Sequence, residues 1–156
     1  MKYVLTVNKM NNIFIKSFSD LTKEELYNIL SLRSEVFIVE QNCAYQDIDQ
    51  KDQFALHVFL KKNNQIIAYT RIFKPKDYFE YSSIGRVVVL KKERASKIGS
   101  QIMSFSIKKI EEIFNETKIK ISAQKYLISF YEKLGFKAIG EEYLEDGIPH
   151  IAMIKN

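Results

Sequence analysis

The chain has 156 residues, of which 46% are hydrophobic and 13% aromatic, with only 5 glycines and 2 prolines. A chain of this length and composition can bury one core and is not expected to be disordered. The net charge is +5, but lysines and glutamates are interspersed, without a long basic run that includes aromatics. Nucleic-acid binding is therefore kept only as an alternative function, because a small polyanionic ligand explains the modest positive net charge equally well.

No apolar run approaches the roughly 18 residues that a membrane-spanning helix needs. The single cysteine, Cys43, excludes an intrachain disulfide and a cysteine-based metal cluster. With only 2 histidines, His57 and His150, we expect no metal site. We therefore expect one cytoplasmic domain over residues 1–156, without membrane or nucleic-acid partners.

The first predicted elements are a short strand over 13–18 and a helix over 22–38. Thr22 and Glu25 have the spacing of a capping box, directly before an apolar stripe. Arg33 lies within that stripe, so we expect it to pair internally with an acidic side chain. Residues 39–53 are polar, acidic and aperiodic, and a loop of this length usually has a function.

The rest of the chain alternates between β and α patterns. A hairpin is predicted over 54–62 and 66–74, and the consecutive valines of the next strand, 81–92, indicate burial on both faces. The further predicted elements are a helix over 97–114, a strand over 118–123, a helix over 124–136 and a strand pair over 136–144 and 148–154. Gly135 is expected to end the last helix in the left-handed conformation, with Phe136 folded back onto it. This order indicates an α+β fold, a mixed α/β domain.

The stretch "KKERASKIGSQIM" follows a predicted strand and begins a helix. Backbone N–H groups at a helix start have no intrahelical partners, and the helix dipole adds positive potential there. Arg94, Lys97 and the N–H groups around Ile98, Gly99 and Ser100 would thus face an anion. By itself this pattern is not specific, because basic residues also begin ordinary solvated helices.

Two segments together are more specific. "IGRVVVLKKERASKIGSQIM" and "SAQKYLISFYEKLGF" resemble the cofactor-binding segments of the GNAT family of acetyl-CoA-dependent N-acetyltransferases. "LYNILSLRSEVFIVEQNCAYQDIDQKD" and "YLEDGIPHIAM" are similar to its ElaA-like branch. The resemblance covers residues 13–154, so residues 1–12 are expected to be an N-terminal extension, with Met10 as an alternative start.

The resemblance implies a twisted, mostly antiparallel central sheet, flanked by helices, with a parallel strand pair at the cofactor cleft. It implies acetyl-CoA as co-substrate and no metal. Backbone groups of Val87, Val88 and Val89 would pair with the pantetheine arm. The pyrophosphate would lie on the turn amides of Arg94, Ala95, Ser96, Lys97, Ile98, Gly99 and Ser100. Lys97 stands at the first glycine of the family motif, which is tolerable if its φ stays negative.

The resemblance also implies a direct transfer. Gln124 stands where many relatives have an asparagine near the cofactor arm, and Tyr131 matches the tyrosine that protonates the departing thiolate. A neutral amine would attack the acetyl carbonyl, with the oxyanion on a strand N–H. Because no covalent enzyme intermediate is needed, Cys43 is not expected to be a nucleophile.

The general base is not fixed by the sequence. Its candidates are Glu40, Asp47, Asp49, Asp52, His57 and His150. Glu40 and Asp49 are favoured, because the acidic loop follows the first helix, where the fold places the acceptor wall. The expected function is acetyl transfer to a primary amine of a small molecule or peptide, by a monomer or homodimer. The alternative is a GNAT-fold acyl-CoA-binding module with little or no catalysis.

Overall fold

The computed structural model describes residues 12–156. Within these residues, seven strands form one sheet in the order β1-β2-β3-β4-β5-β7-β6, in which β4 and β5 are the one parallel pair. The strands are β1 (Ile13–Ser17), β2 (Leu56–Lys62), β3 (Gln65–Phe73), β4 (Ser82–Val89), β5 (Ile119–Gln124), β6 (Lys137–Glu145) and β7 (Ile148–Lys155). The expected mixed α/β fold with one parallel pair is confirmed. The expected N-terminal extension, apart from Asn12, lies outside the described residues.

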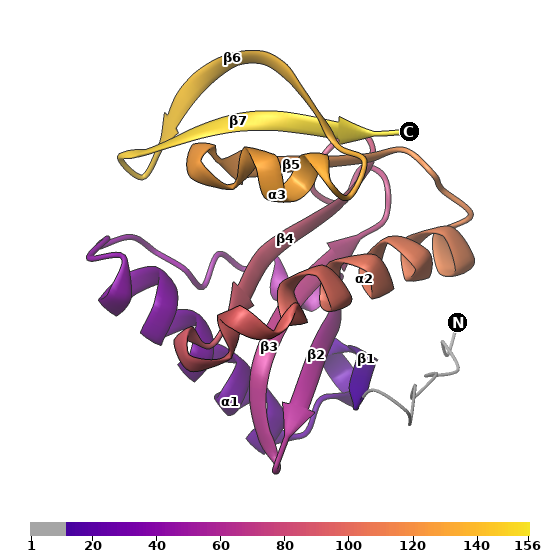
Figure 1. Ribbon diagram of the computed structural model, residues 1–156. Coiled ribbons are helices and arrows are strands. Elements are labelled where there is room, and N and C mark those ends of the chain that lie inside the picture. Colours follow the sequence, from indigo (N-terminus) through magenta and orange to yellow (C-terminus); the bar gives the residue numbers. More distant parts are fainter. Residues whose placement is uncertain (1–11) are drawn as a thin grey trace.

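Three α-helices and several short helices join these strands. The α-helices are α1 (Lys23–Arg33), α2 (Ile98–Phe114) and α3 (Ile128–Glu132), and the shorter ones are η1 (Phe18–Asp20), η2 (Ser34–Glu40), η3 (Asp52–Phe54), η4 (Lys91–Ser96) and η5 (Lys125–Leu127). β3 is buried from Ile66 to Phe73 and contacts both α1 and α2. Figure 1 shows β1–β4 with α1 and α2 as one half of the molecule, and β5–β7 with α3 as the other. Within residues 12–156, no helix is long and apolar enough to cross a membrane.

The first helix begins as predicted but ends differently. Thr22 accepts from the Glu25 N–H, and the Glu25 carboxylate accepts from the Thr22 N–H, which confirms the capping box. After Arg33 the backbone widens into the π-helical segment η2, which continues to Glu40. Such wide turns are frequent at functional sites, and here η2 contributes Val36 and Glu40 to the pocket described below.

The sheet opens between its two parallel strands. β4 pairs with β5 only at Ser82↔Ile119 and Ser83↔Lys120, and beyond these pairs the two strands diverge (Figure 1). The expectation that the valines of β4 are buried on both faces is therefore wrong. Val87 and Val89 are only partly buried, because they line the pocket that opens where the two strands part.

A β-bulge sits in β4 at the point of divergence. β3 advances from Tyr69 to Arg71 while β4 advances from Val88 back to Gly85, so β4 holds one extra residue. Arg86, within the bulge, has φ 52°, a left-handed conformation that costs energy for a residue with a Cβ. Thr70 Oγ1 donates to the Gly85 carbonyl at 2.8 Å, which holds this irregular backbone in place.

The predicted helix over 124–136 is formed only in part. β5 runs to Gln124, η5 makes a tight turn, and α3 spans only Ile128–Glu132. Its end is as predicted: Gly135 has φ 90°, its N–H donates to Glu132 and the Phe136 N–H donates to Tyr131. This is a Schellman motif, and its hydrophobic contact joins the rings of Tyr131 and Phe136, whose centroids are 6.1 Å apart. The helix end thereby fixes the position of Tyr131.

Candidate active site

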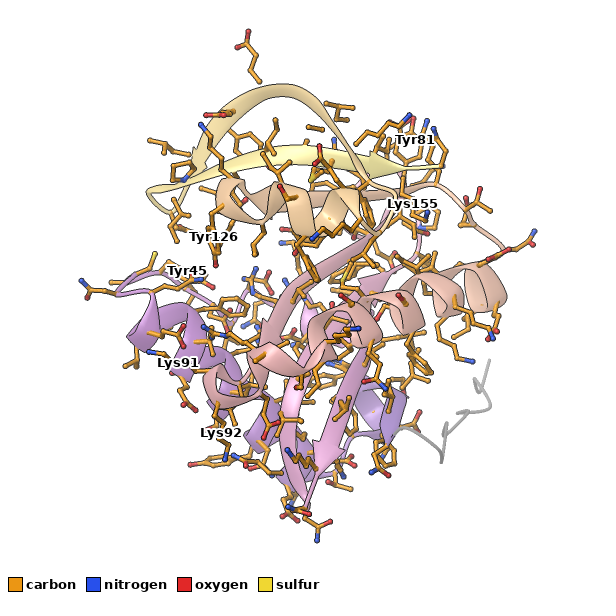
Figure 2. All side chains as sticks on the ribbon, in the orientation of Figure 1. Tyr45, Tyr81, Lys91, Lys92, Tyr126 and Lys155 are labelled. Carbon is orange, nitrogen blue, oxygen red and sulfur yellow. The ribbon has the colours of Figure 1, made fainter. Side chains whose placement is uncertain are left out.

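A pocket of about 540 Å³ fills the opening between β4 and β5. One wall is η2, the following loop and β4, and the opposite wall is β5, α3 and the turn between β6 and β7. Figure 2 shows Tyr45 and Tyr126, which both line the pocket, on opposite sides of the space between the two halves. The pocket thus runs between the two halves of the molecule, from the start of α2 toward the β6–β7 turn.

Most residues expected to bind the cofactor line this pocket. They are Val87, Val88, Val89, Arg94, Ala95, Lys97, Gly99, Ser100, Gln124 and Tyr131. Two of the expected turn residues do not line it, since Ile98 is buried in the core and the Ser96 hydroxyl donates to the Glu93 carbonyl. The start of α2 therefore faces the pocket with its unpaired N–H groups, which is the arrangement that an anion requires.

Lys97 does not keep a negative φ. Its φ is 60° and its ψ is 11°, so the residue that stands for the first motif glycine is left-handed. This conformation costs about 1–2 kcal/mol for a residue other than glycine. The glycine preference at this position therefore has a backbone cause, and the expectation for Lys97 was wrong in this respect.

Replacing Lys97 by glycine should raise the free energy of unfolding by about 1 kcal/mol, because the left-handed strain is removed. Urea denaturation of the purified variant measures this change. Lys97→Ala is the matched control: it removes the charge but keeps a Cβ, and it should not stabilise the protein. Equal stabilisation by both substitutions would show that the lysine charge, and not the backbone, is responsible.

Arg94 and Glu40 are paired with one another. The Arg94 guanidinium donates to both Glu40 oxygens, at 2.5 and 2.9 Å, and its Nε donates to the Val89 carbonyl at 3.0 Å. These hydrogen bonds lower the pKa of Glu40 from its ordinary value. The pair joins η2 to η4 beside the start of α2. The role of Glu40 as a base stays a prediction, and its ion pair with Arg94 favours a structural role.

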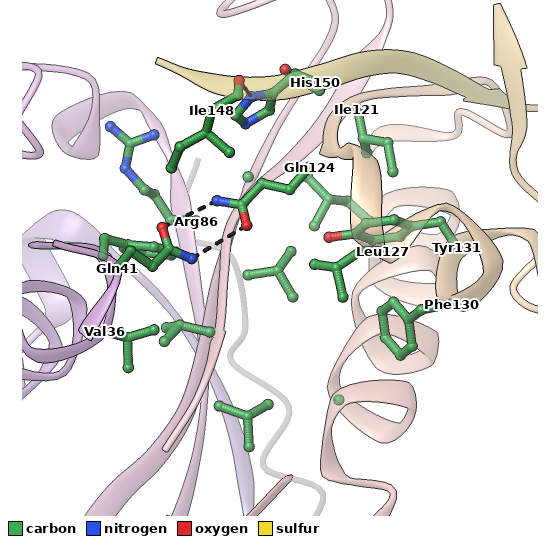
Figure 3. Close-up of a pocket in the computed structure, with 18 of the residues that line it drawn as sticks. Val36, Gln41, Arg86, Ile121, Gln124, Leu127, Phe130, Tyr131, Ile148 and His150 are labelled. Carbon is green, nitrogen blue, oxygen red and sulfur yellow. Dashed lines mark hydrogen bonds between the residues drawn. The ribbon is translucent and has the colours of Figure 1, made fainter. Parts of the chain in front are cut away.

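Tyr131 lies on the β5–α3 wall with 5% of its surface exposed. Figure 3 shows it beside Ile121 and Leu127, with its hydroxyl directed into the pocket. Burial raises the pKa of this hydroxyl above its ordinary value. Tyr131 consequently stays protonated over the working pH range, as a proton donor must.

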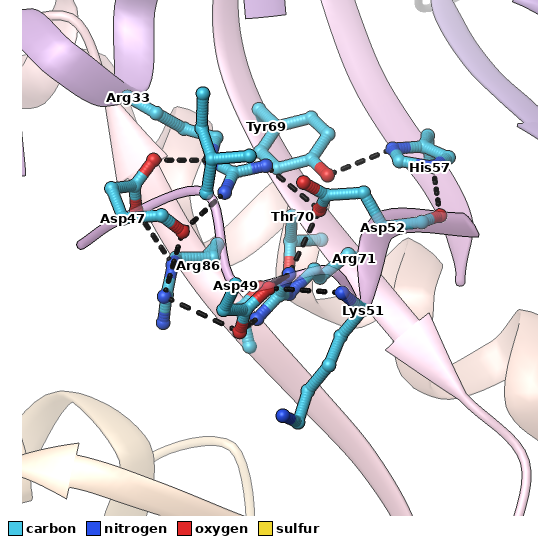
Figure 4. Close-up of polar contacts among 12 residues, drawn as sticks. Arg33, Asp47, Asp49, Lys51, Asp52, His57, Tyr69, Thr70, Arg71 and Arg86 are labelled. Carbon is cyan, nitrogen blue, oxygen red and sulfur yellow. Dashed lines mark hydrogen bonds and ion pairs between the residues drawn. The ribbon is translucent and has the colours of Figure 1, made fainter. Parts of the chain in front are cut away.

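The acidic loop is tied to three arginines (Figure 4). Arg33 is fully buried and donates to Asp47 at 2.9 Å and to Asp52 at 2.8 Å, which confirms its expected internal pairing. Arg71 donates to Asp52 and to both oxygens of Asp49. This network folds the loop against β3 and β4.

Asp49 does not line the pocket. Burial by itself would raise its pKa, but the hydrogen bonds and charge of Arg71, with the charge of Arg86, hold the pKa well below its usual range. His57 is also occupied: Tyr69 and the Asp52 carbonyl bind its two nitrogens, and burial lowers its pKa to about 4. The role of Asp49 as a base stays a prediction, and its contacts favour a structural role.

Gln41 and Arg86 line the pocket but are not among the site residues that the sequence predicts. Gln41 and Gln124 exchange two amide hydrogen bonds of 3.2 Å across the cleft (Figure 3), and Arg86 reaches Asp47 at 2.7 Å from the bulge. The position of the acidic loop after the first helix predicts that this segment forms part of the acceptor wall, but it does not predict a contact between Gln41 and Gln124. That partnership joins residues 83 positions apart, which no local signal reveals.

A mixed sheet that opens at one parallel strand pair, with a helix start at the opening, is the architecture of the GNAT acyltransferases. A family model described as an acetyltransferase (GNAT) domain matches residues 18–156. The chain therefore belongs to the GNAT acetyltransferase family.

Within the family, this chain is similar to protein ElaA of Escherichia coli. The two are 42% identical over 139 residues, which cover 88% of this chain and 91% of ElaA. The crystal structure of E. coli ElaA superposes with a TM-score of 0.87, covering 94% of this chain and 100% of that one. An acyl-CoA N-acyltransferase from Pseudomonas aeruginosa is 38% identical with a TM-score of 0.86, covering 92% and 99%.

Proposed function

We propose that this protein transfers an acetyl group from acetyl-CoA directly to a primary amine of a small molecule or a peptide. The observation that carries the proposal is one continuous pocket whose lining includes both the start of α2 and Tyr131. A helix start binds phosphates, and Tyr131 is a protonated hydroxyl in the same cavity. Membership of an acetyltransferase family supports the same reaction.

In this proposal each part of the pocket has a separate role in binding or catalysis. The first N–H groups of α2, with Lys97 and Ser100, bind the pyrophosphate, and the cleft edge of Val87–Val89 pairs with the pantetheine amides. A β4 N–H at the bulge stabilises the oxyanion when the amine attacks the thioester. As the C–S bond breaks, the Tyr131 hydroxyl gives its proton to the sulfur, and the tyrosinate regains a proton from the new amide nitrogen.

The alternative is an acyl-CoA-binding module with little or no catalysis. It is favoured by the ion pairs of Glu40 and Asp49, since a carboxylate whose pKa is lowered is a weak base. Both functions require the ligand to bind, and only one requires turnover.

A two-part experiment tests the proposal. Acetyl-CoA at millimolar concentration should raise the melting temperature, because a ligand that binds only the folded state stabilises it. Thiol release should then be measured over polyamines, amino acids, aminoglycosides and peptide N-termini. Stabilisation without thiol release from any acceptor would leave only the binding module, and the absence of stabilisation would overturn both functions. Salt-sensitive retention on heparin without stabilisation would instead indicate nucleic-acid binding.

A further inference from the structure

A set of polar side chains on one face of β5, β7 and β6 is not used by the mechanism above. Side chains of directly opposed residues lie on the same face of a sheet, and His150 opposes both Gln124 of β5 and Tyr143 of β6. Ser122 and Glu145 lie two residues from Gln124 and Tyr143, and so share that face. Figure 3 shows Gln124 directed into the pocket, and His150, Ser122 and Glu145 line the same pocket.

The contacts of His150 determine which nitrogen holds its proton. Nδ1 lies 2.7 Å from the Ile148 carbonyl oxygen, and a carbonyl can only accept, so Nδ1 carries the hydrogen. Nε2 of the neutral ring is then left with a free lone pair. The ring is stacked on Tyr143 and has 8% of its surface exposed. A histidine held by a backbone carbonyl through Nδ1, with Nε2 turned to a cavity, has the arrangement of a general base.

Glu145 provides a negative charge close to His150 Nε2. Its Oε2 accepts from the Ser122 hydroxyl at 2.7 Å and lies 3.9 Å from His150 Nε2. Within residues 12–156, no lysine or arginine forms an ion pair with Glu145. Glu40, Asp47, Asp49 and Asp52, in contrast, each pair with an arginine. A cation that enters the pocket can therefore bind the Glu145 carboxylate, which no lysine or arginine of residues 12–156 neutralises and which lies beside the Nε2 atom of His150.

Other charged and titratable groups surround His150 in the pocket. Glu145 and Tyr143 face it from β6, while β5 presents the neutral Ser122 and Gln124. Other charged or titratable residues that line the pocket include Cys43, Tyr45, Arg71, Tyr78, Arg86 and Asp146. Arg86 is already bound to Asp47, and burial, followed by the charge of Glu145, raises the pKa of Tyr78.

We propose that His150 is the general base of the acetyl transfer and that Glu145 binds the ammonium group of the acceptor beside it. This inference rests on the proposed function. The substrate enters as R–NH₃⁺, bound by the Glu145 carboxylate, and gives one proton to His150 Nε2. The neutral nitrogen forms the C–N bond, the C–S bond breaks, and Tyr131 passes a proton to the thiolate and regains the second amine proton. His150 releases its proton to solvent.

His150→Asn and Glu145→Gln test these two roles. The asparagine amide can keep the hydrogen bond to the Ile148 carbonyl but offers no base, and the glutamine keeps an acceptor for Ser122 without the charge. His150→Asn should lower kcat/KM for the amine about 100-fold or more and remove the low-pH limb of the profile. Glu145→Gln should act on KM for the amine, by about tenfold. Neither should change KM for acetyl-CoA.

Two controls separate a base from a structural residue. Glu142→Gln removes another β6 carboxylate, one that pairs with Lys125 on the surface, and it should leave the activity unchanged. Ethylamine, which is protonated at neutral pH, is compared with trifluoroethylamine, which is largely neutral. The loss caused by His150→Asn should be much smaller for trifluoroethylamine, whereas a structural defect would affect both amines equally. An equal loss, or a loss under threefold, overturns the role of His150.

NMR of the two histidines tests the inference without turnover. Ring nitrogen spectra should show the Nδ1–H tautomer for His150 and the Nε2–H tautomer for His57, whose Nε2 meets the Asp52 carbonyl. Ethylammonium should shift the His150 signals in the unmodified protein but not in Glu145→Gln. If acetyl-CoA stabilises the protein but no amine turns over, the proposed function fails, while these shifts still establish the ammonium site. An Nε2–H tautomer at His150, or no shift with ethylammonium, overturns the inference.

Discussion

Replacing Tyr131 by phenylalanine should lower kcat about 10²- to 10³-fold, because the substitution removes only the hydroxyl that protonates the thiolate. The ring, 5% exposed, keeps its contacts with Phe130 and Phe136, so stability and stabilisation by acetyl-CoA should change little. Thiol release with an accepted amine measures kcat, and the thermal shift measures binding.

The pH profile adds a second signature. Burial raises the pKa of Tyr131, so the hydroxyl stays protonated as pH rises, and the wild-type rate should not decline between about pH 8 and 10 through this residue. Tyr27→Phe removes a hydroxyl from α1 at a side chain that is 75% exposed, and it is the control for nonspecific loss. A Tyr131→Phe enzyme with kcat within threefold of wild type would remove Tyr131 from the mechanism.

Replacing Arg33 by methionine should cost about 3–5 kcal/mol of the free energy of unfolding. Methionine fills much of the volume, but Asp47 and Asp52 then lose a buried partner that binds them at 2.9 and 2.8 Å. The cost arises because the two carboxylates stay buried after losing the guanidinium that balanced their charge and donated hydrogen bonds to them. Urea denaturation at pH 7 measures it.

An exposed ion pair supplies the comparison. Lys125→Met breaks the ion pair with Glu142. The Lys125 side chain is 53% exposed and the Glu142 side chain 49%, so the substitution should lower the free energy of unfolding by less than about 1 kcal/mol. A loss at Arg33 as small as the loss at Lys125 would show that Arg71 and Arg86 satisfy the aspartates unaided. The network would then not be required to hold the loop wall of the pocket.

Features that depend on neighbouring residues were predictable from the sequence. The capping box of Thr22 and Glu25 and the left-handed stop at Gly135 are each closed by contacts within a few residues. The β–α unit with its helix start at residue 98 was predicted almost to the residue. The predicted length of α3 is wrong. The apolar spacing of residues 124–136 predicts one continuous helix, whereas Gln124 ends β5 and the short helix η5 precedes α3.

The candidate site was predictable only in part. Segments named for cofactor binding line one pocket, although their roles stay predictions until activity is measured. The sequence favours Glu40 and Asp49 as bases only through their position in the acidic loop, and it gives no indication of which arginine each carboxylate contacts. The sequence does not distinguish His150 from the five other candidate bases, because the neighbours that set it apart, Glu145 and Gln124, come from two other strands.

The sequence alone determined the family, the order of strands and helices, and the local helix ends, since these rest on periodicity, motif and short-range hydrogen bonds. Only the tertiary structure decided where the sheet opens, that Lys97 is left-handed, and which charged groups are neutralised. β4 and β5 pair over two positions and then part, and this divergence is set by packing between distant segments. The same packing occupies Glu40 and Asp49 with arginines and leaves Glu145 beside the free nitrogen of His150.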